Sequence, residues 1–222
     1  MNHDDLLSRP IVLVIALALV SLLPFAFMTT TAFVKIATVL QIVRSAIGAQ
    51  SVPSSSVIMA LAAALTVVAM APTGDKIMAR AAPIFAGRTP DTAALITRGV
   101  DAVREPMRDF LKNNASPTER ARFLDVVRQS RPEADRAGVG GDDLVVLVPA
   151  FVVTELTEAF AIGFLIYLPF LVIDLVVANV LLALGMQMMS PTQVSLPFKL
   201  LLFVAIDGWG LLARALVAGY QG

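Results

Sequence analysis

Charged side chains are distributed very unevenly along this chain of 222 residues. Residues 75–143 hold 23 of its 34 charges, 12 basic and 11 acidic, and the rest of the chain holds only 11. A charge at the centre of a lipid bilayer costs at least roughly 2.5–3.5 kcal/mol, so long stretches without charges indicate membrane-type segments. The sequence therefore predicts N-terminal hydrophobic helices over residues 1–74, a polar helical insert over residues 75–143, and C-terminal hydrophobic helices over residues 144–222.

The composition disfavours several classes of protein. Hydrophobic residues make up 57% and charged residues 15% of the chain, against about 45–50% and about 25% in soluble domains. The formal net charge of zero provides no basic surplus for nucleic-acid binding. Cysteine is absent and His3 is the only histidine, which argues against a disulfide framework, a nucleophilic triad and a metal site. We expect no enzyme activity and no cofactor.

Four apolar segments are candidates for membrane helices, each of which needs about 20 residues to cross a bilayer. Residues 10–34 carry no charge, and Pro24 is expected to kink this helix. Residues 57–72 are short and rich in alanine, which favours close packing against other helices. The other two segments are residues 144–186 and 196–220.

The third segment is too long for one ordinary span. A continuous helix over these residues would measure about 64 Å, about twice the thickness of a bilayer core. We therefore expect it to bend, to form a hairpin or to leave the membrane plane. Pro149 and Pro169 are the expected break points, and Pro191 is expected to break the chain beyond its end.

The insert is expected to be helical. Ser116 and Glu119 form a capping box with Pro117 at the first helical position. An earlier helix is expected over residues 91–112, from its apolar spacing. Lys35 and Arg44 are the only charges between the first two apolar segments, which favours a cytoplasmic link. We therefore expect a multi-pass protein of a bacterial inner membrane, with the insert on the periplasmic side.

Seven charged residues interrupt apolar sequence and need an explanation. Their signs are nearly balanced, which favours pairing within the chain or between subunits. We expect Glu155 or Glu158 to pair with Lys199, across a subunit boundary. The alternative is an ion-coupled transporter or channel subunit, in which acidic side chains form a relay. The seven residues are Lys35, Arg44, Glu155, Glu158, Asp174, Lys199 and Asp207, and the relay would use Asp174, Glu158 and Asp207.

Glu155 and Glu158 are three residues apart and so share one face of a helix. Paired carboxylates could serve as general acid and base. With no histidine and no metal motif nearby, catalysis is disfavoured.

A cluster of methionines lies between Gly185 and Pro191, two residues that favour a loop. Methionine is flexible and commonly fills irregular apolar gaps. On the residues alone, a greasy interfacial turn is favoured over a functional seal. The cluster consists of Met186, Gln187, Met188 and Met189.

Several motifs, in order, resemble one family. Residues 149–164, with the sequence PAFVVTELTEAFAIGF, are similar to the signature of the FliP/SctR family, the P/R subunit of the type III protein export apparatus. The resemblance covers nearly the whole chain except the insert. The further motifs are residues 168–174, 183–186, 195–200 and 207–209, and near the start residues 22–25, 31–35, 44–48 and 70–72.

The resemblance implies an all-α, non-enzymatic subunit of a helical, multi-subunit export gate. Such subunits assemble in several copies, expected to be five, with S-type and T-type partners and then with U-type and V-type subunits. Unfolded secreted proteins are the cargo. Flagellar members often carry a cleaved signal peptide and a longer N-terminus. By this resemblance the chain is expected to be an injectisome member.

The resemblance also reverses the interpretation of the methionine cluster. In the family, the corresponding loop resembles a gasket around the closed pore. Met186, Met188 and Met189 thereby become the expected gate residues, and Gln187 departs from the more uniformly methionine-rich versions.

Overall fold

The computed structural model describes residues 3–48, 53–86 and 92–220. Within these ranges the chain is helical and contains no strand, which confirms the predicted all-α class. The helices are α1 (His3–Thr30), α2 (Phe33–Ile47), α3 (Ser55–Ala69), α4 (Ala71–Ala86), α5 (Thr92–Asn114), α6 (Pro117–Gln129), the 3-10 helix η1 (Glu133–Gly138), α7 (Leu144–Ala183), α8 (Pro191–Ala205) and α9 (Gly208–Ala218).

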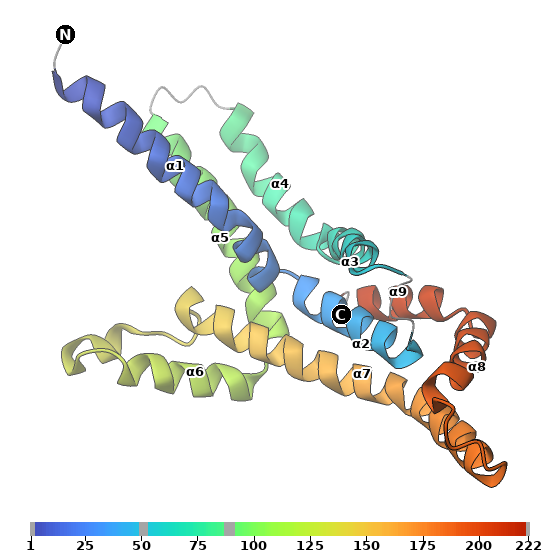
Figure 1. Ribbon diagram of the computed structural model, residues 1–222. Helices are drawn as coiled ribbons and strands as arrows, with labels where there is room; N and C mark the ends of the chain where they lie inside the picture. Colours follow the sequence, from blue (N-terminus) through green and yellow to red (C-terminus); the bar gives the residue numbers. More distant parts are fainter. Residues whose placement is uncertain (1–2, 49–52, 87–91, 221–222) are drawn as a thin grey trace.

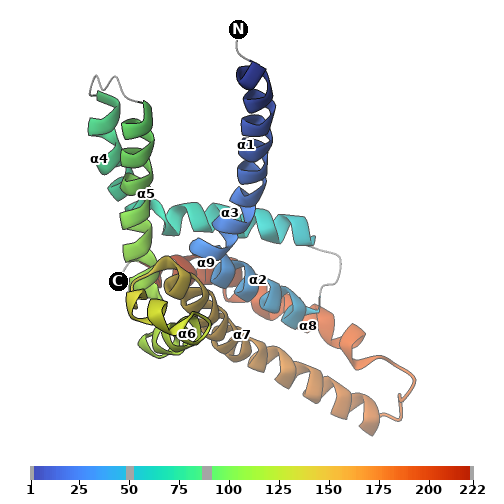
Figure 2. The same ribbon diagram turned by 90° about the vertical axis from the view of Figure 1, so that its left-hand side faces the viewer.

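The long helix α7 forms the base of an open, branched molecule (Figure 1). α6 and α2 both lie along α7, α8 returns beside its C-terminal part, and α9 packs on α3 and α8. α1 and the α4–α5 hairpin extend away from this base as two separate arms (Figure 2). Many helices therefore have a face that no other described part of the chain covers.

The main apolar core lies where α2 meets α3, α7, α8 and α9. α2 is buried on most of its circumference, with Ile36, Val39 and Val43 fully enclosed. α3 contacts it through a narrow stripe that includes Ile58 and Ala62, and small side chains on this stripe let the two backbones approach closely. One face of the short, alanine-rich segment therefore packs against α2 within the chain, while Val57, Val67 and Val68 stay exposed.

The insert packs on the beginning of α7. Phe110 and Leu111 of α5 are buried against Leu147 and Phe151 of α7, and the Phe110 and Phe151 rings lie 5.6 Å apart between centroids. The predicted boundary at residue 144 coincides with the first residue of α7, whereas the boundary at residue 75 falls inside α4.

The predicted N-cap of α6 is confirmed, but only one half of the capping box forms. The Ser116 hydroxyl accepts a hydrogen bond from the Glu119 N–H at 3.1 Å. The Ser116 N–H donates to Thr154 Oγ1 on α7 at 3.0 Å, while the Glu119 carboxylate pairs with Arg122 at 2.7 Å. The cap therefore also fastens α6 to α7.

The expected breaks at Pro149 and Pro169 are wrong. α7 runs without interruption through both prolines. A proline inside a helix removes one backbone hydrogen bond and strains the turn before it. Packing next to each proline holds the helix together, because Phe151, two residues after Pro149, and Phe170, directly after Pro169, are both buried. Pro191 is the first residue of α8, a position where its missing N–H has no helical partner to lose.

α7 is the one helix in the described part of the chain that is long and apolar enough to cross a membrane by itself. Three pairs of helices, bent by 71°, 55° and 58°, pass the same test when each pair counts as one span. Only 11% of the most apolar stretch of α7 is buried within the chain. Most of its surface is therefore left for lipid or for neighbouring subunits.

Gly163 permits the close approach of α7 to α2. A Cβ atom at this position would lie 2.5 Å from Cδ1 and 2.9 Å from Cγ2 of Ile42. We expect Gly163→Ala to destabilise the purified chain by about 1–3 kcal/mol, the usual cost of overpacking, in thermal unfolding in detergent. Gly99→Ala is the matched control, because nothing lies within 4 Å of a Cβ there.

Ile42→Ala should recover part of the loss when it is combined with Gly163→Ala. Alanine is a better helix former than glycine by about 1 kcal/mol, so Gly163→Ala and Gly99→Ala both gain helix propensity. If Gly163→Ala were as stable as the Gly99→Ala control, the close contact would not constrain the two helices.

Candidate functional site

Three of the seven predicted charges meet where α2 packs along α7. Lys35 Nζ lies 2.9 Å from Glu155 Oε1 and 2.7 Å from Glu158 Oε2. The Lys35 side chain is 9% exposed, Glu155 is fully buried, and Glu158 is 53% exposed. The contact with Glu155 Oε1 lacks hydrogen-bond geometry, so it is an ion pair only. Glu155 and Glu158 share one face of α7, and the single lysine faces both.

Tyr220 completes this cluster, and no motif in the sequence points to it. Its hydroxyl donates to Glu155 Oε2, and Lys35 Nζ lies 4.5 Å from the centre of its ring. A small polar cavity of about 290 Å³ adjoins the cluster.

The second charge cluster joins α7 to α8, and it corrects the expected partner of Lys199. Lys199 Nζ lies 2.6 Å from Asp174 Oδ2 and donates to the Ala46 carbonyl at 3.2 Å. Ser195 Oγ donates to Asp174 Oδ1 at 2.5 Å. Lys199 therefore pairs within its own chain with Asp174, and Glu155 and Glu158 pair with Lys35. α2 lies on α7 beside both glutamates, and this placement decides the partners.

The remaining charges lie apart from these clusters. Asp207 pairs with Arg214 at 3.2 Å on the surface, and Arg44 donates to Ser55 Oγ at 2.9 Å. The three carboxylates of the relay hypothesis, Asp174, Glu158 and Asp207, each pair with a different cation. The structure therefore does not bring them together.

The methionine cluster lies in the loop between α7 and α8, at one tip of the molecule (Figure 1). Gly185 turns the chain there with a φ of 71°. Met188 is 100% exposed, Met186 41% and Met189 44%, and Gln187 is also exposed. The loop therefore presents flexible thioethers outward, where another chain can meet them.

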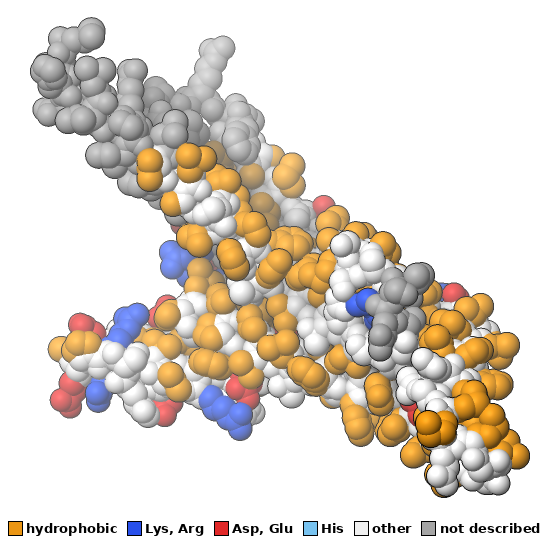
Figure 3. Space-filling model, in the orientation of Figure 1, with side chains coloured by type: hydrophobic (Ala, Val, Ile, Leu, Met, Phe, Trp, Pro, Cys, Tyr) orange, Lys and Arg blue, Asp and Glu red, His pale blue; other side chains and the backbone are white. Residues whose placement is uncertain are grey.

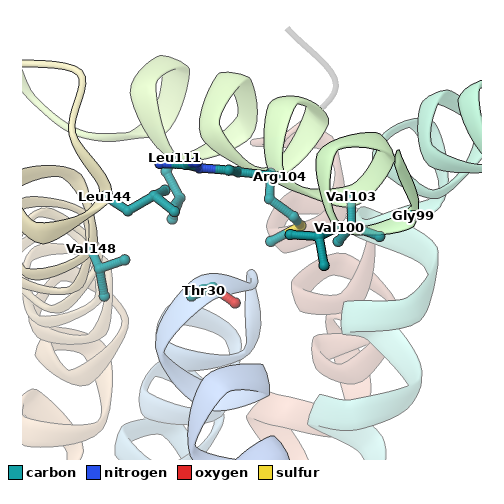
Figure 4. A pocket seen from close by; sticks show the side chains of 9 residues that line it. Thr30, Gly99, Val100, Val103, Arg104, Leu111, Leu144 and Val148 are labelled. Carbon is teal, nitrogen blue, oxygen red and sulfur yellow. The ribbon is translucent and has the colours of Figure 1, made fainter. Parts of the chain in front are cut away.

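Apolar side chains also cover much of the visible surface on α7 and α8 (Figure 3). An entirely apolar groove of about 450 Å³ lies between these two helices, lined by Val176, Val180 and Phe198 among others. A larger groove of about 780 Å³ lies between Thr30 at the end of α1, Val103 on α5 and Val148 on α7 (Figure 4). Exposed apolar area of this kind is typical of surfaces covered by lipid or by other subunits.

Within the described ranges, no three His, Cys, Asp or Glu side chains lie close enough together to hold a metal ion. Glu155 and Glu158, the candidates for acid–base chemistry, both form an ion pair with the same cation, Lys35. The arrangement thus supports a structural role for these two carboxylates.

Comparisons with known proteins agree with this view of the chain. The model of the FliP family matches residues 16–216. The hypersensitivity response secretion protein HrcR of Ralstonia nicotianae is 43% identical over 209 residues, 94% of this chain and 96% of its own length. The Yop proteins translocation protein R of Yersinia pestis is 43% identical over 214 residues, 95% of this chain and 96% of its own length.

A flagellar protein is similar as well. The flagellar biosynthetic protein FliP of Caulobacter vibrioides is 38% identical over 218 residues, 97% of this chain and 78% of its own length. The family model spans residues 16–216, a range that contains the seven predicted charges and the methionine loop. The three relatives cover 94–97% of this chain. The chain belongs to the FliP family.

Proposed function

We propose that this chain is a core subunit of a type III protein export gate. The observation that carries the proposal is its near full-length similarity to the secretion, translocation and flagellar biosynthetic proteins named above. In this role the chain assembles in several copies, expected to be five, with S-type, T-type, U-type and V-type partners. Unfolded proteins pass along the axis of the assembly, and the chain itself catalyses no reaction.

The open shape of the single chain supports assembly. α1 exposes Leu22, Leu23 and Phe25, and α7 leaves most of its apolar surface uncovered. Large apolar surfaces of this kind are stable only against lipid or against other subunits. The paired charges inside the chain fit helices that pack on protein, and they do not favour an ion relay. We place the gate at the bacterial inner membrane and the insert on its periplasmic side.

The methionine loop is the proposed gasket. Its three methionines are exposed after the end of α7. Flexible thioether side chains can fill a pore that holds no cargo and can rearrange around polypeptides of varied sequence. Gln187 adds one polar side chain to an otherwise apolar loop. In the closed assembly, loops from neighbouring copies would meet and exclude ions.

Replacing Met186, Met188 and Met189 together with alanine should open this barrier. Alanine lacks the flexible side chain that fills the gap, so we expect membranes carrying the assembled triple variant to leak small ions. The leak is measured as dye or ion flux from vesicles that contain the complex purified through a tag on this chain. Met78→Ala is the matched control, because Met78 on α4 is 69% exposed and lies outside the loop.

Two outcomes would contradict the proposal at different points. Triple-variant vesicles as tight as the control would remove the gasket role and leave the assembly role standing. Recovery of the tagged chain as a monomer, with no other small membrane protein, would remove the assembly role itself.

A further inference from the structure

Tyr220 lies two residues after the end of α9, where three separate parts of the chain meet. Its hydroxyl donates to Glu155 on α7, and its ring lies beneath the ammonium of Lys35 on α2. The same ring stacks on Phe110 of α5, with centroids 6.0 Å apart and an interplanar angle of 24°. One side chain from the C-terminal part therefore touches the N-terminal part, the insert and the long helix.

Tyr220 also joins two apolar clusters of the fold. The first is the main core around α2, and the second is formed by Phe110 and Leu111 of α5 with Leu147 and Phe151 of α7. In the described part of the chain, Tyr220 and Met70 are the two partly buried side chains that pack against both clusters. Phe110 belongs to the cluster that holds the insert on α7, and it is 7% exposed. The contact of Tyr220 with Phe110 therefore links the insert to the buried ion pair of Lys35 and Glu155.

We propose that Tyr220 is a positioning residue that clips the insert helix α5 to the Lys35–Glu155–Glu158 cluster. The two ends of its side chain do different work. The hydroxyl acts through Glu155, because its hydrogen bond holds one carboxylate oxygen while the other faces Lys35. The ring acts through Phe110, because stacking fixes the end of α5 above α7. The proposal concerns the single chain and holds whether or not the chain forms an export gate.

Amide hydrogen exchange on the purified full-length chain in detergent tests this division. Tyr220→Ala removes both ends of the clip, so we expect faster exchange around Phe110 and around Glu155. A hydrogen bond to a charged group corresponds to about a tenfold or larger effect near Glu155, and an aromatic pair to roughly a two- to tenfold effect near Phe110. Exchange in α8 should stay as in the wild type.

Tyr220→Phe separates the two ends. It keeps the ring on Phe110 and removes only the hydroxyl, so exchange should rise near Glu155 and remain unchanged in α5. Tyr167→Phe is the matched control: Tyr167 is the other tyrosine of the chain and packs against the first apolar cluster, away from the insert. This control should leave exchange near both Glu155 and Phe110 unchanged.

Three results would overturn the proposal. The first is unchanged exchange around Phe110 in Tyr220→Ala. The second is an equal rise in every helix, α8 included, because a general loss of stability would then explain it. The third is a Tyr220→Phe variant with α5 as exposed to exchange as in Tyr220→Ala. If Tyr220→Ala does not fold, unchanged exchange near Glu155 in Tyr220→Phe alone would still refute the role of the hydroxyl.

Discussion

Replacing Lys35 with methionine is expected to destabilise the chain by about 3–5 kcal/mol, the typical cost of leaving a buried charge without its partner. Glu155 is fully buried, and Lys35 is the cation beside it. Methionine has a similar length and keeps the packing of α2 on α7, so the loss reports the charge. The measurement is the free energy of unfolding of the purified chain in detergent, from thermal or denaturant curves.

Two further variants distinguish a lost charge pair from lost packing. Glu158→Gln should cost far less, because Glu158 is 53% exposed and water can replace its partner. Lys35→Met combined with Glu155→Gln should regain much of the loss, because neither charge is then buried. If the separate losses of Lys35→Met and Glu155→Gln simply add in the double variant, Lys35 and Glu155 are not energetically coupled.

Asp174→Asn is expected to cost more than Lys199→Met, although both break the same ion pair. The Lys199 side chain is 3% exposed, so without the carboxylate its ammonium stays buried, with the Ala46 carbonyl as a neutral partner. Asp174 is 25% exposed and keeps the Ser195 hydroxyl when the lysine is gone. We expect a loss of about 3–5 kcal/mol for Asp174→Asn, measured by the same unfolding curves.

Asp207→Asn is the matched control for this pair. It breaks the surface contact with Arg214, in which both side chains are at least 70% exposed, and such pairs contribute about 0–1 kcal/mol. Asparagine also tolerates the left-handed backbone of this position, where φ is 52°. A larger loss for Lys199→Met than for Asp174→Asn would contradict this prediction. It would show that the unpaired Asp174 carboxylate costs more than the unpaired Lys199 ammonium.

Local patterns could be predicted from the sequence because they depend on neighbours in the chain. The cap at Ser116, the loop at Gly185 and the start of α7 at Leu144 all follow from residues within a turn or two. The helical class follows from the long charge-free stretches, from the apolar spacing of residues 91–112 and from the family resemblance. Such signals do not depend on which helices later come together.

The partners of the charges could not be predicted in the same way. The sequence indicates that the buried charges pair, but it predicts Glu155 or Glu158 as the partner of Lys199, whereas the partner in the structure is Asp174. The choice depends on α2 packing along α7, which brings Lys35 to the glutamates over a long separation in sequence. Tyr220 was missed for the same reason, since a single tyrosine after the last helix carries no pattern.

The continuity of α7 through Pro149 and Pro169 has a consequence for the two ends of the helix. Because α7 continues through both prolines, one helix of 40 residues connects the insert to the methionine loop, a distance of about 60 Å at 1.5 Å per residue. No stretch of irregular backbone divides it into halves that could swing independently. The position of the methionine loop relative to the insert is therefore set by the direction of one continuous helix.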